Sequence, residues 1–253
     1  MRRDPDGAAA RSPAHCAPMT IPPLGWLTAL CALLAIAGAT SVADLPWLHM
    51  AFKPAATLAI IAFAWPRGRG TPVRRRWLLA GLGMSLVGDV ALMWPQGGLP
   101  GLVRFLRAHL AYLAAFTRER RLGAWPVAFV LYALVAGAVL VVLWPSVPAA
   151  LRVPVAVYVV ALASMAAQAL VVARRAHDGT PGARRRARVL AVGGALFVLS
   201  DALLATNKFA MPLPLASLWV LSTYWAAQWC IACWLAPAGA PAPAAHMPLN
   251  RPV

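Results

Sequence analysis

Long apolar stretches separated by short polar segments recur along the whole chain. Eight of them approach or reach the ~17–25 residues that a helix needs to cross a bilayer. Barrel strands would be shorter, ~9–11 residues, and would alternate in polarity, which these stretches do not. The pattern therefore predicts an all-α, polytopic membrane protein with eight transmembrane helices, at residues 24–42, 50–65, 77–94, 101–116, 124–143, 154–173, 189–206 and 215–235.

The composition agrees with a membrane protein, because 61% of the residues are hydrophobic and only 12% are charged. Soluble domains carry about 25% charged residues. The chain then divides into a polar tail (1–23), the helical membrane domain (24–235) and a Pro/Ala-rich tail (236–253) that we expect to be disordered. The first stretch also has the outline of a signal peptide cut after Ala43, although we favour a retained helix.

The net charge is +16, and most of the basic residues are arginines that follow every second apolar stretch. By the positive-inside rule these segments are cytoplasmic. Both termini then lie on the cytoplasmic side of the membrane, which we expect to be a bacterial inner membrane. Basic segments at a membrane surface also suit anionic lipid headgroups, so no nucleic-acid partner is predicted. The arginines are Arg67, Arg69, Arg74, Arg75, Arg76, Arg118, Arg120, Arg121, Arg174, Arg175, Arg184, Arg185, Arg186 and Arg188.

Only two of the seven acidic residues, Asp89 and Asp201, fall inside predicted spans. A carboxylate near the centre of a membrane helix opposes insertion by about 2.5–3.5 kcal/mol, so function is the first hypothesis for such a residue. The structural alternative is an ion pair with Lys53 or a hydrogen bond between helices, which contributes only about 0.6 kcal/mol. We therefore interpret the two aspartates as functional.

The two aspartates lie in similar segments 112 residues apart. "GLGMSLVGDVAL" (81–92) aligns with "GGALFVLSDALL" (193–204), and "AYLAAF" (111–116) aligns with "TYWAAQ" (223–228), so Tyr112 corresponds to Tyr224. A shift of four spans keeps the orientation of each helix. The alignment predicts two parallel four-helix repeats with a site between them.

Other polar residues are expected near the aspartates, in the outer half of the bundle. On the fourth predicted span Phe105, His109 and Tyr112 share one helical face, and Tyr224 and Gln228 form an i, i+4 pair on the eighth. His109 is the only histidine inside a predicted span. A C-x-x-C pair in the eighth span, at 230–233, lacks a second pair and is interpreted as buried thiols.

These residues resemble the YhhN-like lysoplasmalogenase family of integral membrane enzymes. The resemblance rests on "FKP" at 52–54, "SLVGD" at 85–89, F-x3-H-x2-Y from Phe105 to Tyr112, "SD" at 200–201 and "TYWAAQ" at 223–228. It implies an eight-span hydrolase that cleaves the vinyl ether bond of lysoplasmalogens, releasing a fatty aldehyde and a glycerophospho-base. The implied partners are the lysophospholipid substrate and membrane lipids. No cofactor is implied.

The chemistry of a vinyl ether suits two carboxyl groups. Protonation of the β-carbon gives an oxocarbenium ion, which water captures to form a hemiacetal and then the aldehyde. A carboxyl group removed from water can hold its proton near neutral pH, while a second carboxylate stabilises the cation and guides water. We therefore expect Asp89 and Asp201 to be catalytic, with either one as the acid.

The remaining candidate site residues divide into two groups. His109, Tyr112 and Tyr224 are expected to orient the carboxyl groups or water, and Gln228 to contact the substrate region. Lys53, Arg104 and Lys208 are expected to hold the lipid phosphate.

Two other functions fit parts of the sequence. A proton-coupled transporter of lipids or small molecules would also use intramembrane carboxylates and a parallel repeat, although the helices show no strong breaks. A metal-dependent hydrolase would use Asp89, Asp201 and His109, but a single intramembrane histidine is few for zinc. No metal is therefore predicted.

Overall fold

The computed structural model describes residues 22–40, 45–176 and 179–239. The predicted tails fall almost entirely outside the described residues, as does the cleavage site considered after Ala43. The described part is all-helical and has no strand, so the predicted fold class is confirmed. Its eight α-helices are α1 (Pro23–Ala39), α2 (Pro46–Ala64), α3 (Pro72–Ala91), α4 (Gly98–Thr117), α5 (Pro126–Leu143), α6 (Ala149–Arg174), α7 (Pro181–Ala205) and α8 (Ala216–Cys233).

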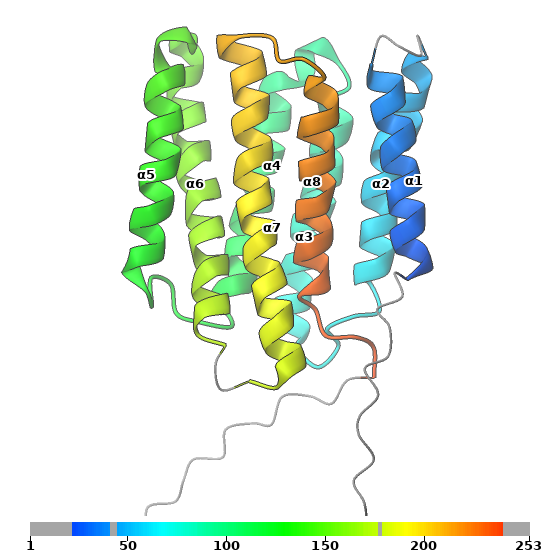
Figure 1. Cartoon of the computed structure of the whole chain (residues 1–253), viewed down its shortest axis with the longest axis vertical. Helices are drawn as coiled ribbons and strands as arrows, with labels where there is room; N and C mark the ends of the chain where they lie inside the picture. Colours follow the sequence, from blue (N-terminus) through cyan, green and yellow to red (C-terminus); the bar gives the residue numbers. More distant parts are fainter. Residues whose placement is uncertain (1–21, 41–44, 177–178, 240–253) are drawn as a thin grey trace, which may run out of the picture.

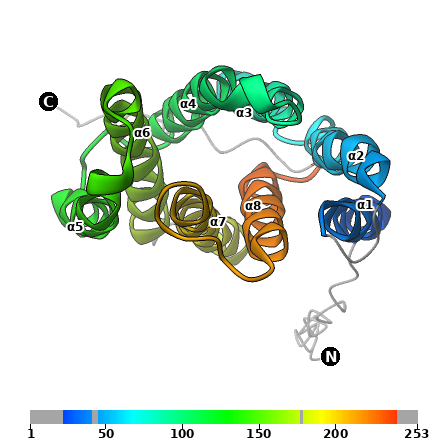
Figure 2. The same ribbon diagram turned by 90° about the horizontal axis from the view of Figure 1, so that it is seen from above.

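The helices run up and down side by side in one bundle (Figure 1). Seen from above, α2, α3, α4 and α6 form an arc, and α7 and α8 face it from the other side (Figure 2). Helix α1 packs against α2, and α5 packs against α6 at the opposite edge of the bundle. The connections after α2 and α4 lie at one end, together with the C-terminal end of α6, and those after α3, α5 and α7 lie at the other.

Four helical segments are long and apolar enough to cross a membrane: Pro46–Ala64, Pro126–Ser146, Ala149–Arg174 and Pro181–Ala210. The chain is therefore a multi-pass membrane protein. The other helices lie alongside these segments but are shorter or more polar; α1, for example, has 17 residues. That all eight cross the bilayer stays a prediction.

Helix ends differ from the predicted stretches where polar residues continue a helix. Five of the eight α-helices in the described ranges begin at a proline, which fits the first turn because the N–H that proline lacks would have no partner there. Helices α3 and α7 consequently start at Pro72 and Pro181, before their arginines. Several arginines expected in connecting segments thus lie on the first turns of helices, at the same end of the bundle.

That end is held together by the arginines themselves. Arg74 forms a salt bridge with Glu119, and Arg67 donates through Nε to the carbonyl of Leu235 over 3.2 Å. Arg120 and Arg175 donate to backbone carbonyls of the neighbouring connecting segments. The basic residues therefore satisfy the exposed carbonyls where helices end.

Glycines bring the helices of adjacent pairs into close contact. A Cβ on Gly81 of α3 would lie 2.3 Å from Cε1 of Tyr112 on α4, and one on Gly88 would lie 2.7 Å from the Phe105 ring. A Cβ on Gly193 of α7 would similarly lie 3.0 Å from the carbonyl oxygen of Ala227 on α8. These approaches position the polar faces of α3, α4, α7 and α8 around one interior.

Candidate active site

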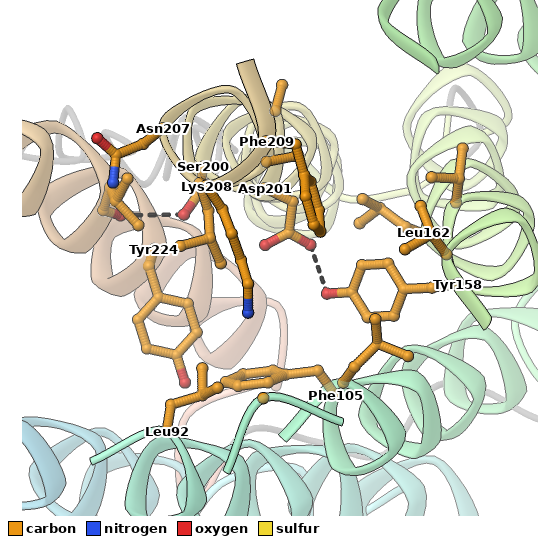
Figure 3. Close-up of a pocket in the computed structure, with 18 of the residues that line it drawn as sticks. Leu92, Phe105, Tyr158, Leu162, Ser200, Asp201, Asn207, Lys208, Phe209 and Tyr224 are labelled. Atoms are coloured by element: carbon orange, nitrogen blue, oxygen red, sulfur yellow. Dashed lines mark hydrogen bonds between the residues drawn. The ribbon is translucent and has the colours of Figure 1, made fainter. Parts of the chain in front are cut away.

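A cavity of about 440 Å³ lies between α2, α3, α4, α5, α6, α7 and α8, toward the end opposite the arginines. Most of its wall is aliphatic or aromatic. Its polar lining comprises His49, Lys53, Asp89, Tyr158, Ser200, Asp201, Asn207, Lys208, Ser217 and Tyr224. Both predicted aspartates thus line the same space. Figure 3 shows Asp201 and Lys208 pointing into it, with Tyr158 reaching toward Asp201 from α6.

Asp89 is buried in a hydrogen-bond network that joins α2, α3 and α8. Its Oδ2 accepts from Thr57 Oγ1 at 2.7 Å and from the Tyr224 hydroxyl at 2.9 Å. Trp225 Nε1 donates in turn to Thr57 Oγ1 over 3.2 Å. These bonds fix the carboxyl group through Oδ2, and the Asp89 side chain lines the cavity.

The network around Asp89 extends to α4. Gln228 donates through Nε2 to the Tyr224 hydroxyl at 3.2 Å, and the Tyr112 hydroxyl donates to Gln228 Oε1 at 2.6 Å. Tyr112 and Gln228 are fully buried and do not line the cavity. They therefore orient Tyr224, which touches Asp89, rather than the space where a ligand fits.

Asp201 has a second network, formed with α4 and α6. The Tyr158 hydroxyl donates to its Oδ2 at 2.6 Å, and His109 Nε2 lies 2.9 Å from the same hydroxyl and 3.6 Å from Oδ2. Because the hydroxyl proton points to Asp201, its oxygen accepts from His109 Nε2. His109 Nδ1 is buried and has no hydrogen-bond partner among the described residues. The histidine thus acts on Asp201 through Tyr158.

The three cationic residues that we expected to hold the phosphate differ in how they are placed relative to the cavity. Lys53 is buried on α2 and lines the cavity with Asp89, yet no salt bridge within the described chain joins the two. Lys208 lies on the π-helix η3 (Thr206–Ala210), with Nζ 3.2 Å from the Cβ position of Gly98. Arg104 is half-buried on α4 and is not among the lining residues. The structure therefore brings two of the three predicted phosphate ligands to the cavity.

Sequence reasoning missed several site residues. Helix α2, a candidate membrane span, begins at Pro46, before the predicted stretch. His49 is therefore a second histidine inside a span, and the prediction that His109 is the only one was wrong. His49 lines the cavity, and its Nδ1 lies 3.0 Å from the Ala35 carbonyl. Tyr158 was also missed, although the chain has only four tyrosines and three of them belong to the two networks. The small number of tyrosines was the feature of the sequence that could have pointed to Tyr158.

The metal site considered from the sequence is not assembled. Asp201 lies near His109, whereas Asp89 belongs to the separate network with Thr57 and Tyr224. No group of three or more His, Cys, Asp or Glu side chains that could hold a metal ion occurs in the described ranges.

Comparison with known proteins gives one consistent result. The model of the YhhN family matches residues 48–235. Lysoplasmalogenase TMEM86B of Homo sapiens is 33% identical over 188 residues, covering 73% of this chain and 74% of that protein. Its Sus scrofa counterpart is 36% identical over 188 residues, covering 72% and 73%. A lysoplasmalogenase of Mycobacterium tuberculosis is 35% identical over 174 residues, covering 65% and 61%. No solved structure gives a significant match.

Proposed function

Because this chain belongs to the YhhN family, we propose that it is a membrane lysoplasmalogenase, which hydrolyses the vinyl ether bond of a lysoplasmalogen. The observation that carries the proposal is the pair of aspartates facing one largely apolar cavity, each with a tyrosine hydroxyl bonded to its carboxyl group. The similarity to proteins named lysoplasmalogenase supports the same reaction.

The lining of the cavity suits both parts of a lysoplasmalogen. A lysoplasmalogen has one apolar chain joined by the vinyl ether to a glycerophospho-base. Lys53 and Lys208 supply positive charge for the phosphate, and the aliphatic wall accepts the chain. The bond to be cleaved then lies between these parts, beside the two carboxyl groups.

In the proposed reaction one aspartic acid transfers its proton to the β-carbon of the vinyl ether. The double-bond electrons form the new C–H bond, and the ether oxygen shares the positive charge of the resulting oxocarbenium ion. The other aspartate stabilises this ion and takes a proton from the attacking water. In the collapse of the hemiacetal, the first aspartate takes the proton of the hemiacetal hydroxyl and the second gives its proton to the leaving glycerol oxygen. The C–O bond breaks to give the aldehyde and the glycerol hydroxyl, and both carboxyl groups return to their starting states. Tyr158 and Tyr224 hold the two carboxyl groups in place.

The test combines product analysis with two isosteric substitutions. Purified protein in detergent is given lysolipids with ester, alkyl-ether or vinyl-ether chains, and mass spectrometry follows release of aldehyde and glycerophospho-base. We expect only the vinyl ether to react. Asp89→Asn and Asp201→Asn should lower the rate by about 10²–10⁴-fold, the usual cost of losing an acid–base group.

The substitutions also separate catalysis from folding. Each replaces a carboxyl group, whose charged form is costly inside the bundle, by a neutral amide of similar shape, so the unfolding temperature in detergent should stay the same or rise. Glu119→Gln, which removes a carboxylate at the opposite end, is the matched control and should keep wild-type turnover. A wild-type protein that releases no aldehyde would contradict the proposal and favour the transporter. Wild-type turnover by either Asn variant would refute the two-carboxylate mechanism.

A further inference from the structure

A second hollow lies beside the cavity, along the seam between α5 and α6. It measures about 320 Å³ and is lined by residues of α5 from 129 to 140 and of α6 from 156 to 164. We call it the α5–α6 groove. Ala136, Leu140 and Val159 line both the groove and the cavity, so the two spaces adjoin.

The groove leads away from the polar end of the cavity. Lys208 and the connection that carries it lie at the end where α5 finishes and α6 begins, whereas the groove follows both helices back toward their middle. Residues 129–140 rise by about 16 Å along a helix. The path thus runs from the charged end of the cavity past Tyr158, which precedes Val159 in the chain, into the apolar body of the bundle.

The groove exists because small residues face each other across the seam. Ala133, Gly137, Ala156 and Ala163 contribute little side-chain volume, and a Cβ on Gly137 would meet no atom within 4 Å. Helix α5 buries only Ala128 and Leu143, so its outer face is apolar and exposed. The groove therefore has an apolar lining, and the two helices that form it lie at one edge of the bundle (Figure 2).

We propose that the α5–α6 groove binds the hydrocarbon chain of the lysolipid, and that Gly137 sets the length and width of chain that the enzyme accepts. This inference rests on the proposed function for the identity of the ligand. The lining residues shared by the cavity and the groove support the proposal. When the vinyl ether lies beside Tyr158 and Asp201, the hydrocarbon chain attached to it can pass along apolar side chains into the groove.

The first measurement is independent of catalysis. An alkyl-ether lysophosphatidylethanolamine that carries a diazirine at the end of its chain is photolysed with the full-length protein, and labelled peptides are mapped by mass spectrometry. We expect labelling on residues 129–140 and 156–164 that excess unlabelled lysolipid suppresses. Competed labelling confined to other helices would overturn the proposal.

Substitution at Gly137 provides the second measurement. Gly137→Phe places a ring in open space within the groove and should reduce the groove labelling about tenfold, the scale on which apolar pockets discriminate by size. Val142→Phe adds the same ring to an exposed position on another face of α5 and should change nothing. Unchanged labelling in Gly137→Phe would contradict the assignment.

Turnover then separates this inference from the proposed function. Gly137→Phe should lower kcat/KM at least about tenfold for long-chain vinyl ethers and leave short-chain ones near the wild-type rate. Groove labelling without any aldehyde release by the wild type would refute the reaction and keep the chain site. Aldehyde release with equal loss for all chain lengths in Gly137→Phe would refute the chain site and keep the reaction.

Discussion

At the scale of single residues, the two aspartates are distinguished by what holds them. Asp89 accepts from a threonine and a tyrosine within a buried network, whereas Asp201 accepts from Tyr158, which is backed by His109. Polar groups inside an apolar bundle find few alternative partners, so each of these bonds fixes geometry as well as adding energy. Tyr158 is the clearest case, because it alone connects His109 to Asp201 by a short hydrogen bond.

Replacing Tyr158 by phenylalanine should impair the reaction and leave the fold intact. Tyr158→Phe removes only the hydroxyl, and the loss of a hydrogen bond to a charged group corresponds to about a ten- to hundredfold lower rate. We expect the loss in kcat rather than in KM, because the hydroxyl positions Asp201. Kinetics with a vinyl-ether lysolipid measure both parameters.

Tyr132→Phe is the matched control for this variant. Tyr132 lies on α5, outside the cavity lining, and its loss of a hydroxyl should not change either kinetic parameter. If Tyr158→Phe kept wild-type kcat, Asp201 would not depend on the His109–Tyr158 pair, and the role assigned to His109 would be wrong.

At the scale of helices, close packing through glycine positions the networks. Gly81 leaves room for the ring of Tyr112, whose hydroxyl bonds to Gln228 on α8 at 2.6 Å. Helices α3, α4 and α8 are thus joined through one tyrosine. Without a hydrophobic driving force between membrane helices, small residues at such contacts are a main source of packing stability.

Gly81→Ala should destabilise the bundle measurably. The new Cβ would lie 2.3 Å from Cε1 of the fully buried Tyr112, so the ring or the helix must move, at a cost of about 1–3 kcal/mol. Gly83→Ala on the same helix meets nothing within 4 Å and should be neutral or slightly stabilising. Thermal unfolding in detergent compares the two variants; equal unfolding temperatures would show that Tyr112 adjusts freely.

The helices were largely predictable from the sequence, whereas their ends and partners were not. Apolarity identifies a helix only where it faces lipid or core, so the arginine-bearing first turns of α3 and α7 lay outside the predicted stretches. Asp89 and Asp201 stood out because charge inside an apolar stretch is rare. Tyr158 and Thr57 did not, because their partners lie 43 and 32 residues away and no local pattern encodes those contacts.

At the scale of the whole molecule, the aspartates of the two halves contact corresponding helices but different partner residues. Asp89 of α3 bonds to residues of α2 and α8, and Asp201 of α7 bonds to or approaches residues of α6 and α4, which are the corresponding helices after a shift of four. The individual partners differ, however: Tyr224 bonds to Asp89, whereas its counterpart Tyr112 bonds to Gln228. The parallel repeat stays a prediction that these neighbours support.

The arginine-rich segments and the cavity lie toward opposite ends of the bundle. The arginine-rich connections lie at one end and the cavity, with Lys208, lies toward the other. Since basic segments are retained in the cytoplasm, we expect the cavity to open toward the outer leaflet. A substrate would then approach from that leaflet, with its chain following the α5–α6 groove toward the middle of the membrane.

Reporter fusions test this orientation directly. Fusions of a reporter that is active only in the cytoplasm should be active at Thr71, Thr117 and Gly179, which adjoin the arginine-rich connections, and inactive at Gly98. A second reporter, active only outside, should give the opposite pattern. The physical reason is the asymmetry of arginine between the two ends, which sets the orientation during insertion. The reversed pattern would place the cavity in the inner half of the membrane, so that cytoplasmic lysolipids would reach the two aspartates instead.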